Sequence, residues 1–313
     1  MRKIMMTLLA TTAVAGLSTL TPAAAKTLDA VGVTLGSLGN PYFVALTKGV
    51  TKQAMSVNPK VRVVSASADY DLNKQFTQID NFIASGVNVI ILNAVDANAM
   101  MPAIKRAQAA GIVVVAADVA ANGADATVET DNVAAGRISC EALAADIGGK
   151  GNVIIQNGPQ VSSVIDRVKG CKEALAAHSD IKILSSDQDG KGSREGGLSV
   201  MQGYLIRYPD IAGLFAINDP QAIGSSLAAK QTHRNGIVIT SVDGAPDIVS
   251  ALQEPNALIK ASASQDPYTM GELALKNAVS IMNGTKPANP IILMTPKLIT
   301  KDNVSSYTGW TQH

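Results

Sequence analysis

The stretch from Ile90 to Asp118, IILNAVDANAMMPAIKRAQAAGIVVVAAD, decides the fold. It predicts a buried strand ending at Asn93, a helix to about Ala110, and a second buried strand ending at Asp118. Short, uninterrupted apolar runs are typical of parallel strands, which are covered on both faces. Asn93 and Asp118 therefore stand at the carboxyl ends of two parallel strands, where open α/β sheets bind their ligands.

The same arrangement recurs later in the chain. LFAINDPQAIG predicts a strand that ends at Asn218, and GIVITSVDGA predicts another that ends at Asp243. Both Asn–Asp pairs are 25 residues apart, from 93 to 118 and from 218 to 243. The repeat predicts two similar domains, each of which presents an amide and a carboxylate to a shared cleft.

Length and composition indicate a folded protein with two domains. The 313 residues suffice for two domains of ordinary size. Hydrophobic residues make up 47% of the chain and charged residues 16%, which provides for sizeable cores and argues against disorder. The formal net charge of +1 comes without a basic cluster, so nucleic acid and membrane surfaces are not expected as partners.

Residues 1–25 have the pattern of a secretory signal peptide. Arg2 and Lys3 give a positive start, Ile4–Leu17 an apolar middle, and Ala23–Ala25 a small-residue cleavage site. A membrane anchor is the other reading, but Thr and Pro residues interrupt the apolar run before it reaches roughly 20 residues. We expect export and cleavage after about Ala25.

From Lys26 onward, predicted strands and helices alternate almost without a break. Such alternation is typical of parallel sheets with right-handed crossovers. We expect the chain to cross between the domains at short segments near Thr130, Gln265 and Pro290. Besides the strands already quoted, the pattern predicts strands at Ala30–Leu35, Val61–Ala66, Thr127–Glu129, Val153–Gln156 and Ile181–Ser185, and helices at about Leu72–Ala84, Asn132–Ile147, Val164–His178 and Glu195–Tyr208.

A series of motifs follows in order along the predicted mature chain: GSLGNPYF, ILNAVDANA, AAD, ETDN, RVKG, VMQ, FAINDPQAIG, VDGAPD and SQDPYTMG. Together they resemble the ribose-binding-protein family, the type I periplasmic sugar-binding proteins of ABC importers. The resemblance implies an α/β fold of two Rossmann-like, doubly wound parallel-sheet domains on a three-segment hinge, with limits at residues 27–130 plus 266–293 and 131–265 plus 294–313. It also implies closure over one sugar and docking on a membrane permease. We therefore expect a monomeric periplasmic solute-binding protein without a cofactor or catalytic residues.

The resemblance also carries over ligand contacts, position by position. A sugar offers hydroxyls that donate and accept hydrogen bonds, and C–H faces that stack on aromatic rings, so carboxylates, amides and aromatics suit it. Helix capping or turn formation is the other reading of the strand-end Asn and Asp residues, and core packing is an equally good reading of the Phe. The matching residues are Asn40, Tyr42, Phe43, Asn93, Asp118, Asn218, Asp243 and Gln265.

The chain departs from the family's pattern at three positions. Val119 and Ile165 stand where the family often has arginines, and Gly192 stands where it has a stacking aromatic. Ribose is therefore one candidate among neutral pentoses, hexoses and polyols, and anionic sugars should be rejected because Asp118 and Asp243 lack those cations. Weaker candidates for ligand contact are Gly36, Thr130, Arg167, Lys191 and Arg194, of which the charged ones also suit a solvated face.

Other chemistries find little support in the sequence. The three histidines are scattered without metal-ligand spacing, so no metal is expected. DGKGSREGG fits no phosphate-loop pattern, and no G-x-S-x-G elbow occurs. A lac-repressor-type regulator would need a helix-turn-helix where the signal peptide stands. Two alternatives remain: a chemoreceptor ligand-presenting sugar-binding protein, and a glycosidase with Asp118 and Asp243 as its acid/base pair.

The two cysteines, Cys140 and Cys171, fall on predicted helices that flank the strand Val153–Gln156. Export would place them in an oxidising compartment, where a disulfide is expected. The other reading is a pair of small buried apolar side chains with free thiols.

Overall fold

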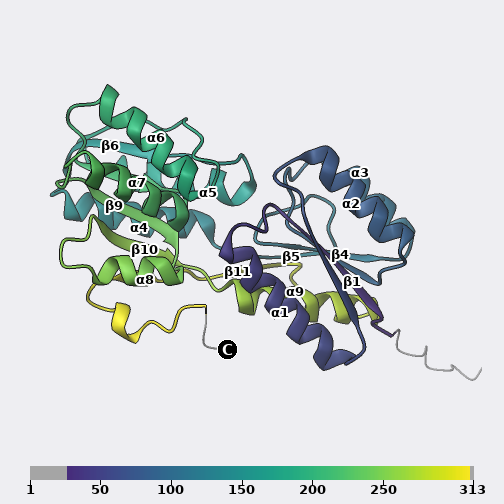
Figure 1. The fold of residues 1–313 in the computed structure, drawn as a ribbon. Coiled ribbons are helices and arrows are strands. Elements are labelled where there is room, and N and C mark those ends of the chain that lie inside the picture. Colours follow the sequence, from purple (N-terminus) through teal and green to yellow (C-terminus); the bar gives the residue numbers. More distant parts are fainter. Residues whose placement is uncertain (1–26, 311–313) are drawn as a thin grey trace, which may run out of the picture.

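The computed structural model describes residues 27–310, which form two α/β domains next to each other (Figure 1). Each domain has a central sheet with helices on both faces, which confirms the predicted fold class. The predicted signal peptide lies outside the described residues. Within residues 27–310, no helix is long and apolar enough to cross a membrane.

The N-terminal domain is built on a parallel sheet of strand order β11-β5-β4-β3-β1-β2. Because β1 and β3 are neighbours, the sheet extends in opposite directions from this pair, and the loops that follow these two strands diverge to leave a crevice. The strands are β1 (Ala30–Leu35), β2 (Arg62–Ser67), β3 (Val89–Leu92), β4 (Val113–Ala117), β5 (Ala126–Thr130) and β11 (Ile291–Met294), and the helices are α1 (Pro41–Val57), α2 (Leu72–Ala84), α3 (Met101–Ala109) and α9 (Pro267–Met282).

Apolar residues on both faces of this sheet explain its continuous apolar strands. Val89 and Ile91 of β3 pack toward α1 and α9, whereas Ile90 and Leu92 pack toward α2 and α3. The two helices α1 and α9 approach closely at Gly49, where an added Cβ would overlap the carbonyl of Tyr268. The sheet is therefore held rigidly, and its strand ends are fixed points for side chains.

The C-terminal domain repeats the plan with the order β12-β10-β9-β8-β6-β7, in which only β12 runs antiparallel to its neighbour. Its switch point lies between β6 and β8. Helices α4 and α5 cover one face, and α6, α7 and α8 the other. The elements are α4 (Asn132–Asp146), β6 (Lys150–Gln156), α5 (Ser162–Leu175), β7 (Asp180–Ser185), α6 (Arg194–Arg207), β8 (Gly213–Ala216), α7 (Asp219–Gln231), β9 (Val238–Asp243), α8 (Pro246–Gln253), β10 (Ile259–Ser264), β12 (Leu298–Thr300) and the 3₁₀ helix Val304–Ser306.

The chain passes between the two sheets three times: from β5 to α4, from β10 to α9, and from β11 to β12. The sequence places the third crossing near Pro290, with a domain limit at residues 293 and 294. Strand β11 follows Pro290 and still pairs in parallel with β5, so the chain leaves the N-terminal sheet only after Met294. We propose these three crossings as the domain limits.

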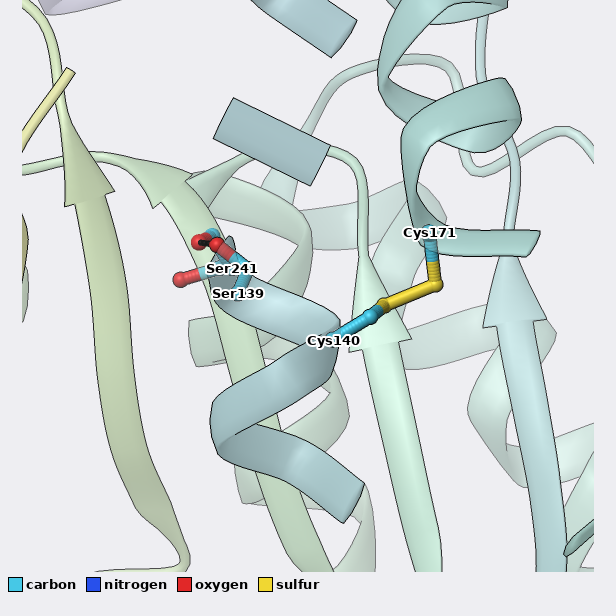
Figure 2. Close-up of a disulfide and its surroundings, with 4 residues drawn as sticks. All are labelled: Ser139, Cys140, Cys171 and Ser241. Atoms are coloured by element: carbon cyan, nitrogen blue, oxygen red, sulfur yellow. Dashed lines mark hydrogen bonds between the residues drawn. A yellow bond between two sulfur atoms is a disulfide. The ribbon is translucent and has the colours of Figure 1, made fainter. Parts of the chain in front are cut away.

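A disulfide joins Cys140 of α4 to Cys171 of α5, as the sequence analysis expected (Figure 2). The two Cα atoms are 5.0 Å apart, and both side chains are fully buried. Beside it, the hydroxyl of Ser139 donates to the carbonyl of Ser241 on β9 at 2.7 Å. The bridge thus fastens together the two helices that cover the same face of the C-terminal sheet.

Candidate ligand-binding site

A cavity lies between the two domains, where the carboxyl ends of their strands face each other. Its volume is about 40 Å³. All eight residues expected to contact a ligand line it: Asn40, Tyr42, Phe43, Asn93, Asp118, Asn218, Asp243 and Gln265. The two domains therefore contribute equivalent strand ends to one cavity.

Asp118 and Asp243 hold equivalent places in the two domains and share an unusual backbone. Their φ angles are 72° and 138°, in the region that residues other than glycine rarely adopt. Such strained residues tend to occur at functional sites, because the surrounding structure must hold them there. Both side chains are almost completely buried and reach the cavity.

Asn93 positions Asp118 from the end of β3. Its Nδ2 donates to Oδ2 of Asp118 at 2.9 Å and to the carbonyl of Ala117 at 3.2 Å. Its Oδ1 accepts the amide N–H of Gly36 at 2.9 Å, which ties the β3 loop to the β1 loop. Gly36, a weaker candidate, thus supports the site without lining the cavity.

Gln265 links Asp243 to the hinge. Its Nε2 donates to Oδ1 of Asp243 at 2.8 Å. Its Oε1 accepts the hydroxyl of Thr130 at 2.7 Å and that of Tyr42 at 3.3 Å. Thr130 does not line the cavity, so this weaker candidate acts through Gln265.

Arg167 supplies the cation that the family pattern places elsewhere. The residue is 4% exposed, and its Nη1 lies 3.5 Å from Oδ1 of Asp243. It is held by Nε donating to Asn132 Oδ1 at 2.8 Å and by Nη1 donating to the carbonyl of Ile217 at 2.9 Å. The reading of Arg167 as part of a solvated face is therefore wrong.

The sequence also predicts that Ile165 takes the place of a family arginine in the cleft. This is wrong, because the residue is 51% exposed and does not line the cavity. In the first turn of α5 the helical period turns Ile165 outward, whereas Ser163 and Val164 line the cavity. Val119 does line it, as expected. The cleft therefore contains one arginine beside its two carboxylates.

Lys191 and Arg194 lie outside the cavity. Both side chains are exposed and line an outer hollow of about 440 Å³, where Arg194 pairs with Asp247. A further hollow of about 660 Å³ beside the hinge includes Thr130 and Gln265, but mainly hinge and C-terminal residues line it. Neither hollow gathers the strand-end carboxylates, so we place the site at the smaller cavity.

Helix capping accounts for part of what the site amides do. Asn40 caps α1 by accepting the amide N–H of Tyr42 at 3.0 Å. Asn218 caps α7 by accepting the amide N–H of Gln221 at 3.1 Å, and it donates to the carbonyl of Gly192 at 3.0 Å. Asn93, Asp118 and Asp243 cap no helix. Asn40 and Asn218 therefore cap helices and line the cavity at the same time.

Asp219, which the sequence analysis did not single out, lies behind Asp243 and is fully buried. Its carboxylate accepts the hydroxyls of Ser241 and Ser262 and, at 2.7 Å, the amide N–H of Ala245. Burial, and after it the charge of Asp243, raises the pKa of Asp219 well above its ordinary value. Asp219 connects β9, β10 and the start of α8, and so holds Asp243 in place.

Burial also raises the pKa of the two cavity carboxyls. For Asp118 the pKa is raised by burial, and the charge of Arg167 and hydrogen bonds from Tyr42 and Asn93 oppose the rise. Burial raises the pKa of Asp243 to about 6, although Arg167 opposes the rise. Partners that donate hydrogen bonds therefore stabilise the ionised form of both carboxyls.

Aromatic and apolar side chains form the rest of the wall. Tyr42 and Phe43 lie edge to face with ring centroids 5.5 Å apart. Tyr70, from the loop after β2, also lines the cavity and was missed. Its sequence signal is the one used for Tyr42: an aromatic residue shortly after a predicted strand. Over residues 27–310, no group of three or more His, Cys, Asp or Glu residues could hold a metal ion.

The fold agrees with comparisons to known proteins. A family model described as "Periplasmic binding protein domain" matches residues 31–286. The chain belongs to this family. Within it, ribose import binding protein RbsB of Bacillus subtilis (strain 168) is 31% identical over 260 residues, which are 82% of each chain. This similarity confirms the predicted resemblance to ribose-binding proteins.

Two further similar proteins come from mycobacteria. The xylitol-binding protein of Mycolicibacterium smegmatis is 30% identical over 278 residues, covering 88% of this chain and 78% of the relative. The solved structure of an ABC transporter solute binding protein from Mycobacterium smegmatis with bound glycerol is 28% identical, with a TM-score of 0.83, and the match covers 91% of this chain and 98% of that one. The two-domain architecture of this periplasmic binding protein is therefore shared along nearly its whole length.

Proposed function

We propose that this periplasmic binding protein captures a small neutral sugar or polyol in the periplasm and, as a monomer, delivers it to the permease of an ABC importer without chemical change. The observation that carries the proposal is the single cavity on which polar side chains from equivalent strand ends of two domains converge. The named ligands of the relatives support it: one imports ribose and another binds xylitol.

The charges in the cavity favour a neutral ligand. One guanidinium, Arg167, faces two carboxylates, Asp118 and Asp243, and its Nε and Nη1 already donate to protein acceptors. A sugar acid or phosphate would bury a third negative charge beside two carboxylates that share one cation, which is costly. Sugar hydroxyls instead donate hydrogen bonds to the carboxylates. These bonds offset the cost of burying the two carboxylates away from water.

Closure of the domains encloses the cavity. Across the cleft the amide N–H of Ala120 donates to the hydroxyl of Ser162 at 2.8 Å, and Val119 packs in one cluster with Val161 and Val164. The volume of about 40 Å³ is far below the roughly 300–1,000 Å³ typical of ligand pockets, so a ligand enters with the domains apart. A ligand that touches both domains stabilises the closed arrangement only, which couples binding to hinge motion.

We assign direct ligand contact to the eight cavity-lining residues that the sequence predicts as ligand contacts, and to Arg167, which lines the same cavity. The carboxylates of Asp118 and Asp243 accept ligand hydroxyls, and Arg167 orients Asp243 while it faces the ligand. The side-chain oxygens of Asn40 and Asn218 are used to cap helices, so each residue has fewer atoms for ligand contact than the sequence predicted. Lys191 and Arg194 take no part in the inner site.

The direct test is to identify the ligand that the protein carries. Protein purified from the periplasm without refolding is denatured, and the released small molecules are analysed by mass spectrometry and returned to the ligand-free protein in a calorimeter. The proposal predicts a neutral pentose, hexose or polyol that binds one per chain. Release of a sugar phosphate, an amino acid or a nucleotide that rebinds at the same stoichiometry would contradict it.

A further inference from the structure

The cleft consists of an inner and an outer chamber. The inner cavity of about 40 Å³ holds the strand-end carboxylates, and the outer hollow of about 440 Å³ opens beside it. Three residues line both: Asn40, Tyr70 and Gly192. These three therefore form the partition between the chambers.

Tyr70 is fixed from the N-terminal domain. Its φ of 57° places it in the left-handed region, and its amide N–H donates to the carbonyl of Gly36 at 3.1 Å. The ring lies against the same glycine, where an added Cβ would come within 2.7 Å of the ring atom Cε1. The loop is held further by Ala68, which donates to the carbonyl of Leu35 at 2.8 Å. These contacts within the N-terminal domain hold the ring of Tyr70 so that it points across the cleft.

Gly192 stands opposite, on the C-terminal domain. A Cβ added to it would lie 3.7 Å from the hydroxyl of Tyr70, 3.5 Å from Nδ2 of Asn218 and 3.8 Å from Cδ of Pro159. Its backbone is fixed, since its amide donates to Oε1 of Gln221 at 2.8 Å and its carbonyl accepts from Asn218. An aromatic ring from one domain therefore ends against bare backbone of the other.

The hydroxyl of Tyr70 is available to a ligand. It makes no hydrogen bond to any other residue that the structure describes, unlike the hydroxyl of Tyr42, which binds Gln265. Burial, and after it the charges of Asp118 and Asp243, raises the pKa of Tyr70 well above its ordinary value. The phenol stays protonated and is a donor beside the inner cavity.

We propose that Tyr70 determines ligand size: its ring closes the inner cavity against the outer hollow, and its hydroxyl donates to the ligand. The ring then bars any substituent that would extend from a bound sugar past Gly192. On this proposal the domains close over a single unsubstituted sugar or polyol and not over its glycosides. This inference rests on the proposed function and adds to it the exclusion of substituted ligands.

The test uses pairs of free and substituted compounds measured by calorimetry. The pairs are D-ribose, L-arabinose and D-galactose with their methyl and 4-nitrophenyl glycosides, D-sorbitol with maltitol, and myo-inositol with galactinol. Tyr70→Gly removes the ring at a backbone angle that glycine adopts freely, and Tyr70→Phe removes only the hydroxyl. Tyr70→Asn replaces the glycine variant if circular dichroism shows that it does not fold, because Asn tolerates the left-handed region. Tyr208→Ala, in the C-terminal domain away from the cavity, is the matched control.

For the compound that binds best, we expect the wild type and Tyr208→Ala to bind the substituted partner at least 100-fold more weakly than the free form. Tyr70→Gly should reduce this ratio below 10-fold, and Tyr70→Phe should keep the ratio while binding the free form about 10-fold more weakly. An unchanged ratio in Tyr70→Gly, or in Tyr70→Asn in its place, would overturn the inference and leave the proposed function standing. Failure of the wild type to bind any free compound would overturn both.

Discussion

The guanidinium of Arg167 and the carboxylate of Asp243 lie 3.5 Å apart, from Nη1 to Oδ1, and each is almost fully buried at the interdomain cavity. Charges are rarely buried unless each has a partner. Here the pair comes from α5 and the end of β9, and two neutral groups, Asn132 and Gln265, complete its hydrogen bonds. Arg167 thus offsets the charge of Asp243 before any ligand enters, whereas Asp118 relies on hydrogen-bond donors such as Asn93.

Removal of Arg167 should therefore affect both stability and binding. Arg167→Ala leaves Asp243 buried without its cation, and breaking such a pair typically costs about 3–5 kcal/mol of unfolding free energy. The exposed pair of Arg106 and Asp80, 2.9 Å apart, is the control, and Arg106→Ala should change stability by less than about 1 kcal/mol. Urea unfolding and calorimetry with the identified ligand measure both effects. Equal losses in the two variants would contradict the assignment.

The raised pKa of Asp243 makes stability depend on pH. Because burial raises this pKa to about 6 in the folded state, the folded protein holds the proton more tightly than the unfolded chain. The contribution of Asp243 is therefore complete below about pH 4 and is lost as pH rises through about 6, by about 1.4 kcal/mol for each pH unit between the unfolded and folded pKa values. Asp118 and Asp219 titrate nearby, so the measured quantity is the stability difference between the wild type and Asp243→Asn without ligand. That difference should fall from pH 4 to pH 7, and a constant or rising difference would refute the expectation.

The disulfide should contribute measurable stability. The bridge closes a loop with a sequence separation of 31 between Cys140 and Cys171, for which the chain-entropy model gives roughly 3–4 kcal/mol. The double variant Cys140→Ala/Cys171→Ala should lose about that much in urea unfolding. Thiol titration of denatured, unreduced wild type should find no free thiol, and two free thiols in protein from the periplasm would rule the bridge out there.

Trp310, the only tryptophan of the chain, connects the C-terminal segment to the site. Its indole N–H donates to the carbonyls of Asp243 at 3.1 Å and Gln265 at 3.0 Å, and its ring meets Tyr42 edge to face at 5.5 Å. Trp310→Phe keeps an aromatic ring but removes both hydrogen bonds, a loss of about 1–3 kcal/mol, although the carbonyl of Asp243 still accepts the amide N–H of Gln265 at 2.8 Å. We expect at least 10-fold weaker ligand binding in this variant.

The control for Trp310 is Tyr208→Phe, which removes a hydrogen bond to the carbonyl of Leu184 outside the cleft. Its ligand affinity should stay within 2-fold of the wild type. Ligand addition should also change the fluorescence of Trp310, because the indole lies between the two domains. Native affinity in Trp310→Phe would show that the C-terminal segment does not position the site.

The sequence predicted the strand ends well because two physical signals agree there. Continuous apolar runs fix parallel strands, and a polar residue at the end of a buried strand has few places to point other than the cleft. The equal spacing of Asn93 to Asp118 and Asn218 to Asp243 reflects one strand–helix–strand unit in each domain. These elements occur at the predicted places, with boundaries that shift by a few residues.

The parts that escaped prediction depend on helix phase and on contacts between distant segments. A shift of two residues along α5 separates the exposed Ile165 from the buried Arg167, and no strand-end rule fixes that phase. Tyr70 and Asp219 gain their roles from residues far away in sequence, Gly192 and Ser262 respectively.

The measurement that tests the central claim most directly is a thermal-shift panel on ligand-free protein. The panel contains neutral pentoses, hexoses and polyols on one side and aldonates and sugar phosphates on the other, with Asp118→Asn as the matched variant. A ligand at 100 times its Kd adds about 2.7 kcal/mol of stability and raises the Tm. We predict that at least one neutral compound raises the Tm of the wild type, that this rise is lost in Asp118→Asn, and that no anionic compound has an effect. Stabilisation by sugar acids or phosphates, with none from neutral compounds, would contradict the account of the cavity.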